Sequence, residues 1–106
     1  PEELQSLCAA LEGAALQHHA GREFHTGWLD GHEVVLVLSR IGKVAAATTA
    51  TRVVERYGAE AIVFTGVAGG LGAGVRVGDV VVARELLQHD LDVSPLFPRH
   101  EVPMTG

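Results

Sequence analysis

Residues 34–65 read VVLVLSRIGKVAAATTATRVVERYGAEAIVFT, and this stretch decides the fold. It opens with five consecutive apolar residues, 34–38, a pattern typical of a strand covered on both faces of a sheet. A helix is predicted over roughly 44–57, and Gly58 is well placed to end it. The apolar run 61–65 predicts a second buried strand. Strand, helix and strand together form a βαβ crossover, which is expected to be right-handed with parallel strands.

A hairpin is predicted directly before this stretch. The dipeptide Asp30-Gly31 accepts the positive φ angles of a tight turn. The second arm is 34–38, and the apolar residues of the first arm are Phe24, Trp28 and Leu29.

The first twenty residues predict a helix. Apolar residues recur at three- and four-residue spacing and form one stripe: Leu4, Leu7, Cys8, Leu11 and Ala15. Pro1 suits the first turn because it needs no amide partner there, and Glu2 and Glu3 favour the positive end of the helix dipole. Gly21 is expected to close the region.

The composition argues against several classes of protein. The 106 residues suit one domain, predicted to span residues 1–106. A net charge of −5 and eight scattered Lys and Arg argue against a nucleic-acid partner. No apolar run approaches the roughly 20 residues of a membrane-spanning helix, and no signal peptide is visible. A single cysteine, Cys8, fits a reducing cytoplasm.

A glycine cluster follows the apolar run 61–65, and its members are Gly66, Gly69, Gly70, Gly72 and Gly74. Glycines after a strand let a ligand approach the backbone, although a tight turn without a ligand is the alternative. The cluster lacks Gly-Lys-Ser/Thr, so it is not a P-loop. It leads into another predicted strand, 80–83, and not into a helix, so a classical dinucleotide site is not expected.

No metal site is expected. The chain has six histidines, but no HxxxH or HExxH spacing occurs. His18 and His19 are adjacent, so on a helix their side chains would point about 100° apart.

Four ordered motifs resemble one family. They are Ser39–Ala47, Thr65–Leu71, Val77–Val82 and His89–Val93, and together they resemble the 5′-methylthioadenosine/S-adenosylhomocysteine nucleosidases of the nucleoside phosphorylase superfamily. The resemblance runs from Glu2 to about Pro103. It implies an α/β fold with a mixed sheet flanked by helices, here in partial form. The family's first strand would precede Pro1, and its second half, with the purine-protonating Asp and the ribose-binding Met-Glu pair, would follow the chain.

The resemblance implies hydrolysis of the N-glycosidic bond of methylthioadenosine and S-adenosylhomocysteine, with release of adenine. Family members use a Glu that directly precedes an apolar residue of the first helix to position and deprotonate water. That Glu corresponds to Glu3, and Glu2 is the alternative because a shift of one residue would exchange them. A carboxylate can accept this proton and stabilise an oxocarbenium-like sugar. Without the resemblance, favourable interaction with the helix dipole would explain both residues.

The family residues that line the base and sugar correspond to Ile41, Val67, Ala68 and Gly69. Open α/β sheets bind ligands at the carboxyl ends of their strands, where these residues are expected. Plain packing roles for Ile41 and Val67 are the alternative.

The nucleophile is expected to be water. Related phosphorylases contact phosphate with an Arg two positions before the first glycine of the motif and a Ser or Thr just after it. Phe64 and Val67 stand at those positions here, so a phosphate dianion would face an apolar wall. The alternatives are a purine or uridine nucleoside phosphorylase, and a non-catalytic remnant that binds nucleosides or dimerises.

The resemblance also implies a homodimer in methionine salvage that needs no cofactor. The segment 93–103 resembles the part that builds the dimer interface, with Val93, Leu96 and Phe97 as candidates to line the partner's pocket. His89, Asp90 and Asp92 are interpreted as structural.

Overall fold

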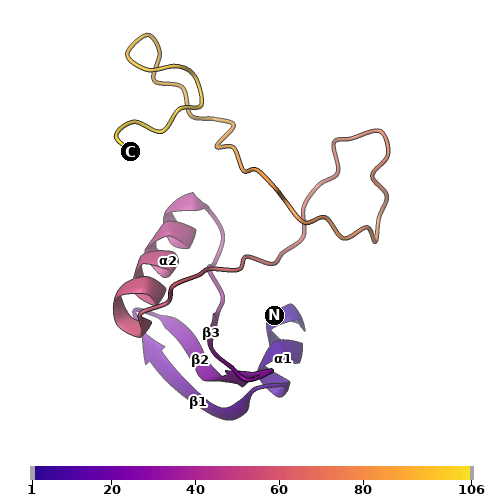
Figure 1. Cartoon of the computed structure of the whole chain (residues 1–106), viewed down its shortest axis with the longest axis vertical. Coiled ribbons are helices and arrows are strands. Elements are labelled where there is room, and N and C mark those ends of the chain that lie inside the picture. Colours follow the sequence, from indigo (N-terminus) through magenta and orange to yellow (C-terminus); the bar gives the residue numbers. More distant parts are fainter. Residues whose placement is uncertain (1, 106) are drawn as a thin grey trace. The chain divides into compact units, whose positions relative to one another are not determined.

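The computed structural model describes the backbone of residues 2–105 and the side chains from Leu4 to Thr105. In chain order the elements are α1 (Glu2–Ala9), β1 (Glu12–His19), β2 (Arg22–Leu29), β3 (His32–Val37) and α2 (Lys43–Tyr57), as Figure 1 shows. The chain divides into two compact units, residues 1–67 and 68–106, and each is described by itself.

The sheet is an antiparallel meander in the order β1-β2-β3. Phe24 pairs with Val37 across β2 and β3. The first strand is irregular between Glu12 and Ala15, where the register shifts. Gly27 permits the close approach of this region, because a Cβ on Gly27 would lie 2.8 Å from the Glu12 carbonyl oxygen. Each strand is joined to the next by a short turn, which sets the register.

The predicted hairpin at Asp30-Gly31 is confirmed. Asp30 has a φ of 48° and Gly31 a φ of 79°, and β2 pairs with β3 on either side of them. Two positive φ angles in a two-residue turn match the right-handed twist of the paired strands. Ala20 and Gly21 repeat this arrangement between β1 and β2, with φ angles of 48° and 69°.

The first helix is shorter than predicted. It ends at Ala9, and residues 12–19 form β1, so the prediction of helix through Ala15 to Gly21 is wrong. The reason is that the turn at Ala20 and Gly21 folds residues 12–19 back along β2, where their backbone groups find partners. Pairing across a hairpin therefore overrides the helical spacing of the apolar residues.

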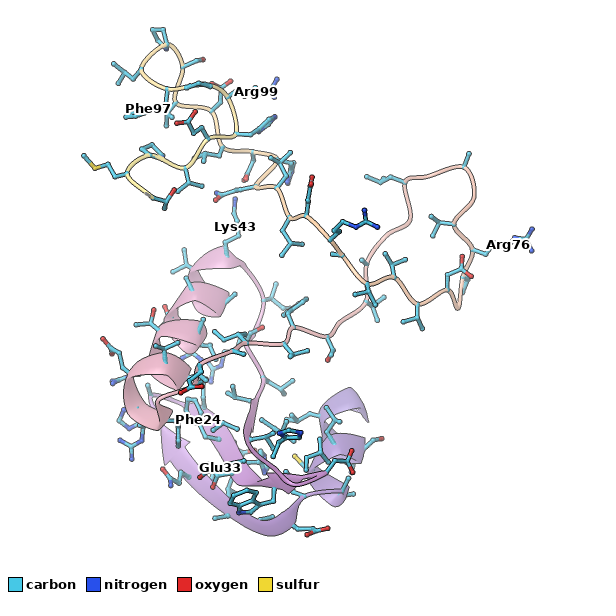
Figure 2. The ribbon with its side chains drawn as sticks, viewed as in Figure 1. Phe24, Glu33, Lys43, Arg76, Phe97 and Arg99 are labelled. Atoms are coloured by element: carbon cyan, nitrogen blue, oxygen red, sulfur yellow. The ribbon has the colours of Figure 1, made fainter. Side chains whose placement is uncertain are left out.

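The second helix is confirmed within one residue of its predicted start. Its C-cap is Gly58, with a φ of 65°, and the Gly58 amide donates to the Val54 carbonyl oxygen at 3.0 Å. This helix packs on the sheet through Phe24, whose place Figure 2 shows. The Phe24 side chain is 0% exposed. The rings of Phe24 and Tyr57 have centroids 5.4 Å apart. The Tyr57 hydroxyl donates to Gln17 Oε1 of β1 at 3.1 Å, so α2 is fixed to two strands.

The two remaining strand predictions are wrong. Among the described residues after Gly58, none lies in a helix or strand, so the runs 61–65 and 80–83 are unpaired and the βαβ crossover is not formed. Their apolar side chains are exposed, including Val63, Val80 and Val82. A strand exists only where a neighbour accepts and donates its backbone hydrogen bonds. An apolar run in the sequence indicates that a segment favours burial. It does not identify which other segment would pair with it and bury it.

Candidate active site

The loop from β3 to α2 presents Ile41. Its backbone turns twice through the left-handed region, at Arg40 with a φ of 66° and at Gly42 with a φ of 98°. Between them the Ile41 side chain is 100% exposed. A plain core role for Ile41 is therefore excluded within the described part of the chain, and its side chain is free to meet a ligand.

A buried hydroxyl holds the loop on its helix. Thr49 of α2 is 3% exposed, and its Oγ1 donates to the Ala45 carbonyl oxygen at 2.8 Å and lies 3.2 Å from the Ser39 carbonyl oxygen. Arg22 Nε donates to the same hydroxyl at 2.7 Å. The Arg22 guanidinium also donates to the carbonyl oxygens of Ala20, at 3.2 Å, and Ala45, at 3.4 Å. Arg22 thus joins the β1–β2 turn to the first turns of α2, and Thr49 adds Ser39, which follows β3.

A second arginine joins the loop after β3 to the β1–β2 turn at the surface. The Arg40 guanidinium donates through Nη2 to the Gly21 carbonyl oxygen. Beside it lies a hollow of about 360 Å³, whose lining residues are Leu4, His18, Gly21, Arg22, Glu23, Leu38 and Arg40. Within the hollow, His18 Nδ1 lies 3.8 Å from Glu23 Oε1, an exposed pair of little energetic weight.

The glycines of the segment 66–74 differ in whether a side chain would fit. None of Gly66, Gly69, Gly70, Gly72 or Gly74 has a positive φ. A Cβ on Gly70 would lie 2.9 Å from Val75 Cγ1, whereas a Cβ on Gly69 would meet nothing within 4 Å. Gly70 therefore permits a local close approach, and Gly69 leaves its backbone open to a ligand.

The motif at Val77–Val82 contains a turn that is held by hydrogen bonds between neighbouring residues. The Arg76 amide donates to Asp79 Oδ2 at 2.8 Å, and the Asp79 amide donates to the Arg76 carbonyl oxygen at 3.1 Å. Gly78 supplies the positive φ of this turn, 96°. Asp79 therefore closes a turn, while the Arg76 side chain projects away from it, as Figure 2 shows.

Asp92 organises a loop in the unit of residues 68–106. Its Oδ1 accepts from the Ser94 hydroxyl at 2.7 Å and from the Ser94 amide at 3.1 Å. These two hydrogen bonds, the hydroxyl first, hold the pKa of the Asp92 carboxyl below its ordinary value, and the charge of His100 acts in the same direction. Arg99 Nε lies 3.6 Å from Asp92 Oδ2, and the His100 amide donates to the Leu91 carbonyl oxygen at 3.0 Å. The structural interpretation of Asp92 agrees with these contacts.

The predicted site residues fall in different parts of the structure. The side chains of Glu2 and Glu3 lie outside the described residues, and the backbone of both belongs to α1. Ile41 and Val67 belong to the unit of residues 1–67, whereas Ala68 and Gly69 belong to the other unit. Val67 is 94% exposed, so no packing role is visible for it within the described chain. The grouping of Glu3, or Glu2 in its place, with Ile41, Val67, Ala68 and Gly69 into one site stays a prediction.

Sequence reasoning missed the two arginines that hold the loop. The sequence does show a long cationic side chain, Arg40, directly before Ile41 and Gly42. Its hydrogen-bond acceptor is the Gly21 carbonyl oxygen, which lies 19 residues earlier and could not be identified from the sequence. Among the described residues, no three His, Cys, Asp or Glu side chains are grouped so that they could hold a metal ion. Within the same residues, every helix is too short or too polar to cross a bilayer.

Comparison with known proteins places this geometry in a family. The model of the family described as "Phosphorylase superfamily" matches residues 1–105. A 5′-methylthioadenosine/S-adenosylhomocysteine nucleosidase from Chromohalobacter salexigens is 46% identical over 91 residues, which cover 86% of this chain and 39% of that protein. The chain thus spans about two fifths of the length of the curated relatives it matches.

Solved structures agree with the sequence comparison. The nucleosidase from Streptococcus pneumoniae, solved with the transition-state inhibitor MT-ImmA, has a TM-score of 0.93 at 38% identity and covers 98% of this chain and 46% of its own. The nucleosidase from Colwellia psychrerythraea, solved with adenine, has a TM-score of 0.89 at 41% identity and covers 95% of this chain and 42% of its own. These values confirm the predicted partial nucleosidase-type fold and the resemblance drawn from the four motifs. The chain belongs to the phosphorylase superfamily.

Proposed function

We propose that the protein containing this chain hydrolyses the N-glycosidic bond of 5′-methylthioadenosine and S-adenosylhomocysteine and releases adenine. The observation that carries the proposal is the 46% identity to a nucleosidase over 86% of the chain. Solved relatives with adenine or a transition-state inhibitor bound support the same substrate class.

In this proposal Glu3 accepts a proton from the attacking water. A carboxylate at the start of α1 suits this task, because it is a base for water and its negative charge stabilises a sugar with oxocarbenium character. Glu2, one residue earlier on the same helix, is the alternative. We assign no proton donor for the purine within residues 1–106.

Four further residues line the base and sugar in the proposal. Ile41 supplies an exposed apolar side chain from the loop before α2. Val67, Ala68 and Gly69 supply a backbone path that a flat ring can approach, since a Cβ on Gly69 would meet nothing within 4 Å. Together they provide apolar contact and backbone groups, as nucleoside sites require.

Water is the proposed nucleophile because apolar side chains stand at the two positions where related phosphorylases contact phosphate. Phe64 is 78% exposed and Val67 94% exposed, and both are apolar. A phosphate dianion beside them would lose water without gaining hydrogen bonds. Phosphorylase activity remains the second candidate, favoured by the superfamily to which the chain belongs.

The protein is further proposed to act as a cytoplasmic homodimer in methionine salvage. Support for the dimer comes from the loop that Asp92 organises, where Leu96 is exposed and Phe97 is partly exposed. Apolar side chains held on an ordered loop suit contact with a second copy of the chain. The single cysteine, Cys8, which is free, supports a reducing compartment.

Adenine release tests the proposal. Purified protein is incubated with methylthioadenosine in phosphate-free buffer and then with added phosphate, and adenine and the sugar product are quantified. We expect adenine in both buffers and a free 5′-methylthioribose product. Turnover only with phosphate, with a 5-methylthioribose 1-phosphate product, would establish the phosphorylase. Adenine that raises the thermal midpoint without any turnover in either buffer would establish a non-catalytic nucleoside-binding protein.

A further inference from the structure

Arg40 occupies a backbone conformation that favours glycine. Its φ of 66° lies in the left-handed region, where the Cβ of an ordinary residue crowds the following carbonyl oxygen. Two residues later the chain uses Gly42 for a similar turn, with a φ of 98°. An arginine at position 40 therefore carries a conformational cost that its side chain has to offset.

The side chain makes one contact that can do so. Arg40 Nη2 donates to the Gly21 carbonyl oxygen in the β1–β2 turn. A Cβ on Gly21 would lie 3.3 Å from the same Nη2, so the guanidinium rests directly against that turn. A charged donor on a carbonyl oxygen is among the stronger hydrogen bonds in proteins.

The rest of the loop is held from the other side. Thr49 Oγ1 reaches the Ser39 and Ala45 carbonyl oxygens, and Arg22 holds that hydroxyl in place. Ile41 lies between these two anchored points and has no packing contact of its own, since its side chain is 100% exposed. Its position is thus set by the backbone on either side of it.

We propose that Arg40 is a positioning residue for Ile41. Its guanidinium ties residues 39–42 to the β1–β2 turn and keeps the Ile41 side chain in the place where it meets the nucleoside. This inference rests on the proposed function for its substrate and on the Arg40–Gly21 contact for its mechanism. Because Ile41 contacts the bound nucleoside and not the reacting bond, loss of the tether weakens substrate binding more than it slows the chemical step.

The kinetic test compares three variants of the protein. Arg40→Met removes the guanidinium and keeps the length, and Arg40→Gly also relieves the left-handed backbone. Arg52→Met removes an arginine of α2 that is not among the hydrogen-bond partners of Arg22, Thr49 or Arg40. We expect Arg40→Met and Arg40→Gly to raise KM for methylthioadenosine by about tenfold, the scale of one charged hydrogen bond, with kcat changed less than about twofold. Arg40→Gly should keep the thermal midpoint of the wild type while still raising KM, which a role in stability alone would not produce. Unchanged KM in both Arg40 variants overturns the proposal, as does an equal rise in Arg52→Met.

Hydrogen exchange gives a test that does not need activity. Amide exchange of the segment 39–43 is measured in the wild type and in Arg40→Met without substrate. We expect exchange there to accelerate about tenfold in Arg40→Met and to stay unchanged in Arg52→Met. Unchanged exchange in Arg40→Met overturns the tether, whatever the kinetics show. If the wild type releases no adenine, the proposed function fails, while accelerated exchange still establishes that Arg40 holds the loop.

Discussion

Residues 12–57 and residues 61–87 differ in how their apolar side chains are accommodated. In the first region three strands pair with one another, α2 covers them, and Phe24 is 0% exposed. In the second region the runs 61–65 and 80–83 pair with no described strand, and Phe64 is 78% exposed. Apolar composition alone therefore does not form a strand.

The difference lies in sequence separation. Each strand of the first region meets its partner through a two-residue turn, so little chain entropy opposes the pairing. Among the described residues, the second region has no partner strand within such a distance. The contrast predicts that equivalent substitutions have large effects in residues 12–57 and small effects in residues 61–87.

Two phenylalanines give the sharpest form of the contrast. Phe24→Ala should lower the free energy of unfolding by about 3–5 kcal/mol, because it empties the space between α2 and the sheet. In a protein that consists of residues 1–106, Phe64→Ala should change it by less than about 0.5 kcal/mol, because that ring is largely exposed there. Urea unfolding followed by circular dichroism measures both. A loss in Phe64→Ala as large as in Phe24→Ala would show that the second region is packed in solution.

Thr49 and Thr48 of α2 allow the loss of a buried hydroxyl to be compared with the loss of an exposed one. Thr49→Val should cost about 1–3 kcal/mol, because Arg22 Nε loses its 2.7 Å acceptor in a half-buried setting. Thr48→Val is the matched control, since the Thr48 hydroxyl is exposed and bonds only to its own helix at Val44. Its effect should stay within about 0.5 kcal/mol. Equal effects in the two variants, measured by urea unfolding, would contradict the network around Arg22.

Two glycines extend the contrast to the backbone. Gly58→Ala should cost about 1 kcal/mol, because the C-cap of α2 has a φ of 65° that alanine adopts poorly. Gly74 has no positive φ, and a Cβ there would meet nothing within 4 Å, so Gly74→Ala should be neutral or slightly stabilising. Thermal unfolding compares them. A loss at Gly74 that exceeds the loss at Gly58 would mean that the glycine segment is more constrained than its geometry indicates.

The smallest expected effect is the pH dependence of the loop that Asp92 organises. Its pKa is held low in the folded loop, so the stabilisation it gives is complete above the pKa of the unfolded chain and is lost as the pH falls through the folded pKa. We expect the Ser94 amide resonance to be constant from neutral pH to about pH 4 and to shift at lower pH. Asp92→Asn should remove the shift. A carboxyl titration of Asp92 above its ordinary value, followed by NMR, would contradict the two Ser94 hydrogen bonds.

Local signals predicted the elements that have local causes. The Asp30-Gly31 turn and the Gly58 cap carry their geometry in two or three residues, and both are confirmed. The first helix was predicted too long, because Leu11 and Ala15 continue a helical stripe, whereas the turn at Gly21 places residues 12–19 in a hairpin. The spacing of the apolar residues alone could not distinguish a long helix from a hairpin.

The site was predicted less completely than the fold. The motif around Ile41 predicted a residue that lines the base and sugar; its side chain is exposed, and the contact with a ligand stays a prediction. The role of Arg40 could not be predicted, because its acceptor is a backbone carbonyl 19 residues earlier that no sequence pattern reveals. Contacts of this kind depend on how two turns approach each other in space.

The most direct test of the central claim is adenine release by the wild type, Glu3→Gln and Glu2→Gln. The account predicts that the wild type releases adenine from methylthioadenosine and that Glu2→Gln remains within about threefold of it. Glu3→Gln should lose a factor of about 10² to 10⁴, the usual contribution of a general base, while keeping the wild-type thermal midpoint. A wild type that releases no adenine, or a Glu3→Gln variant as active as the wild type, would contradict the account.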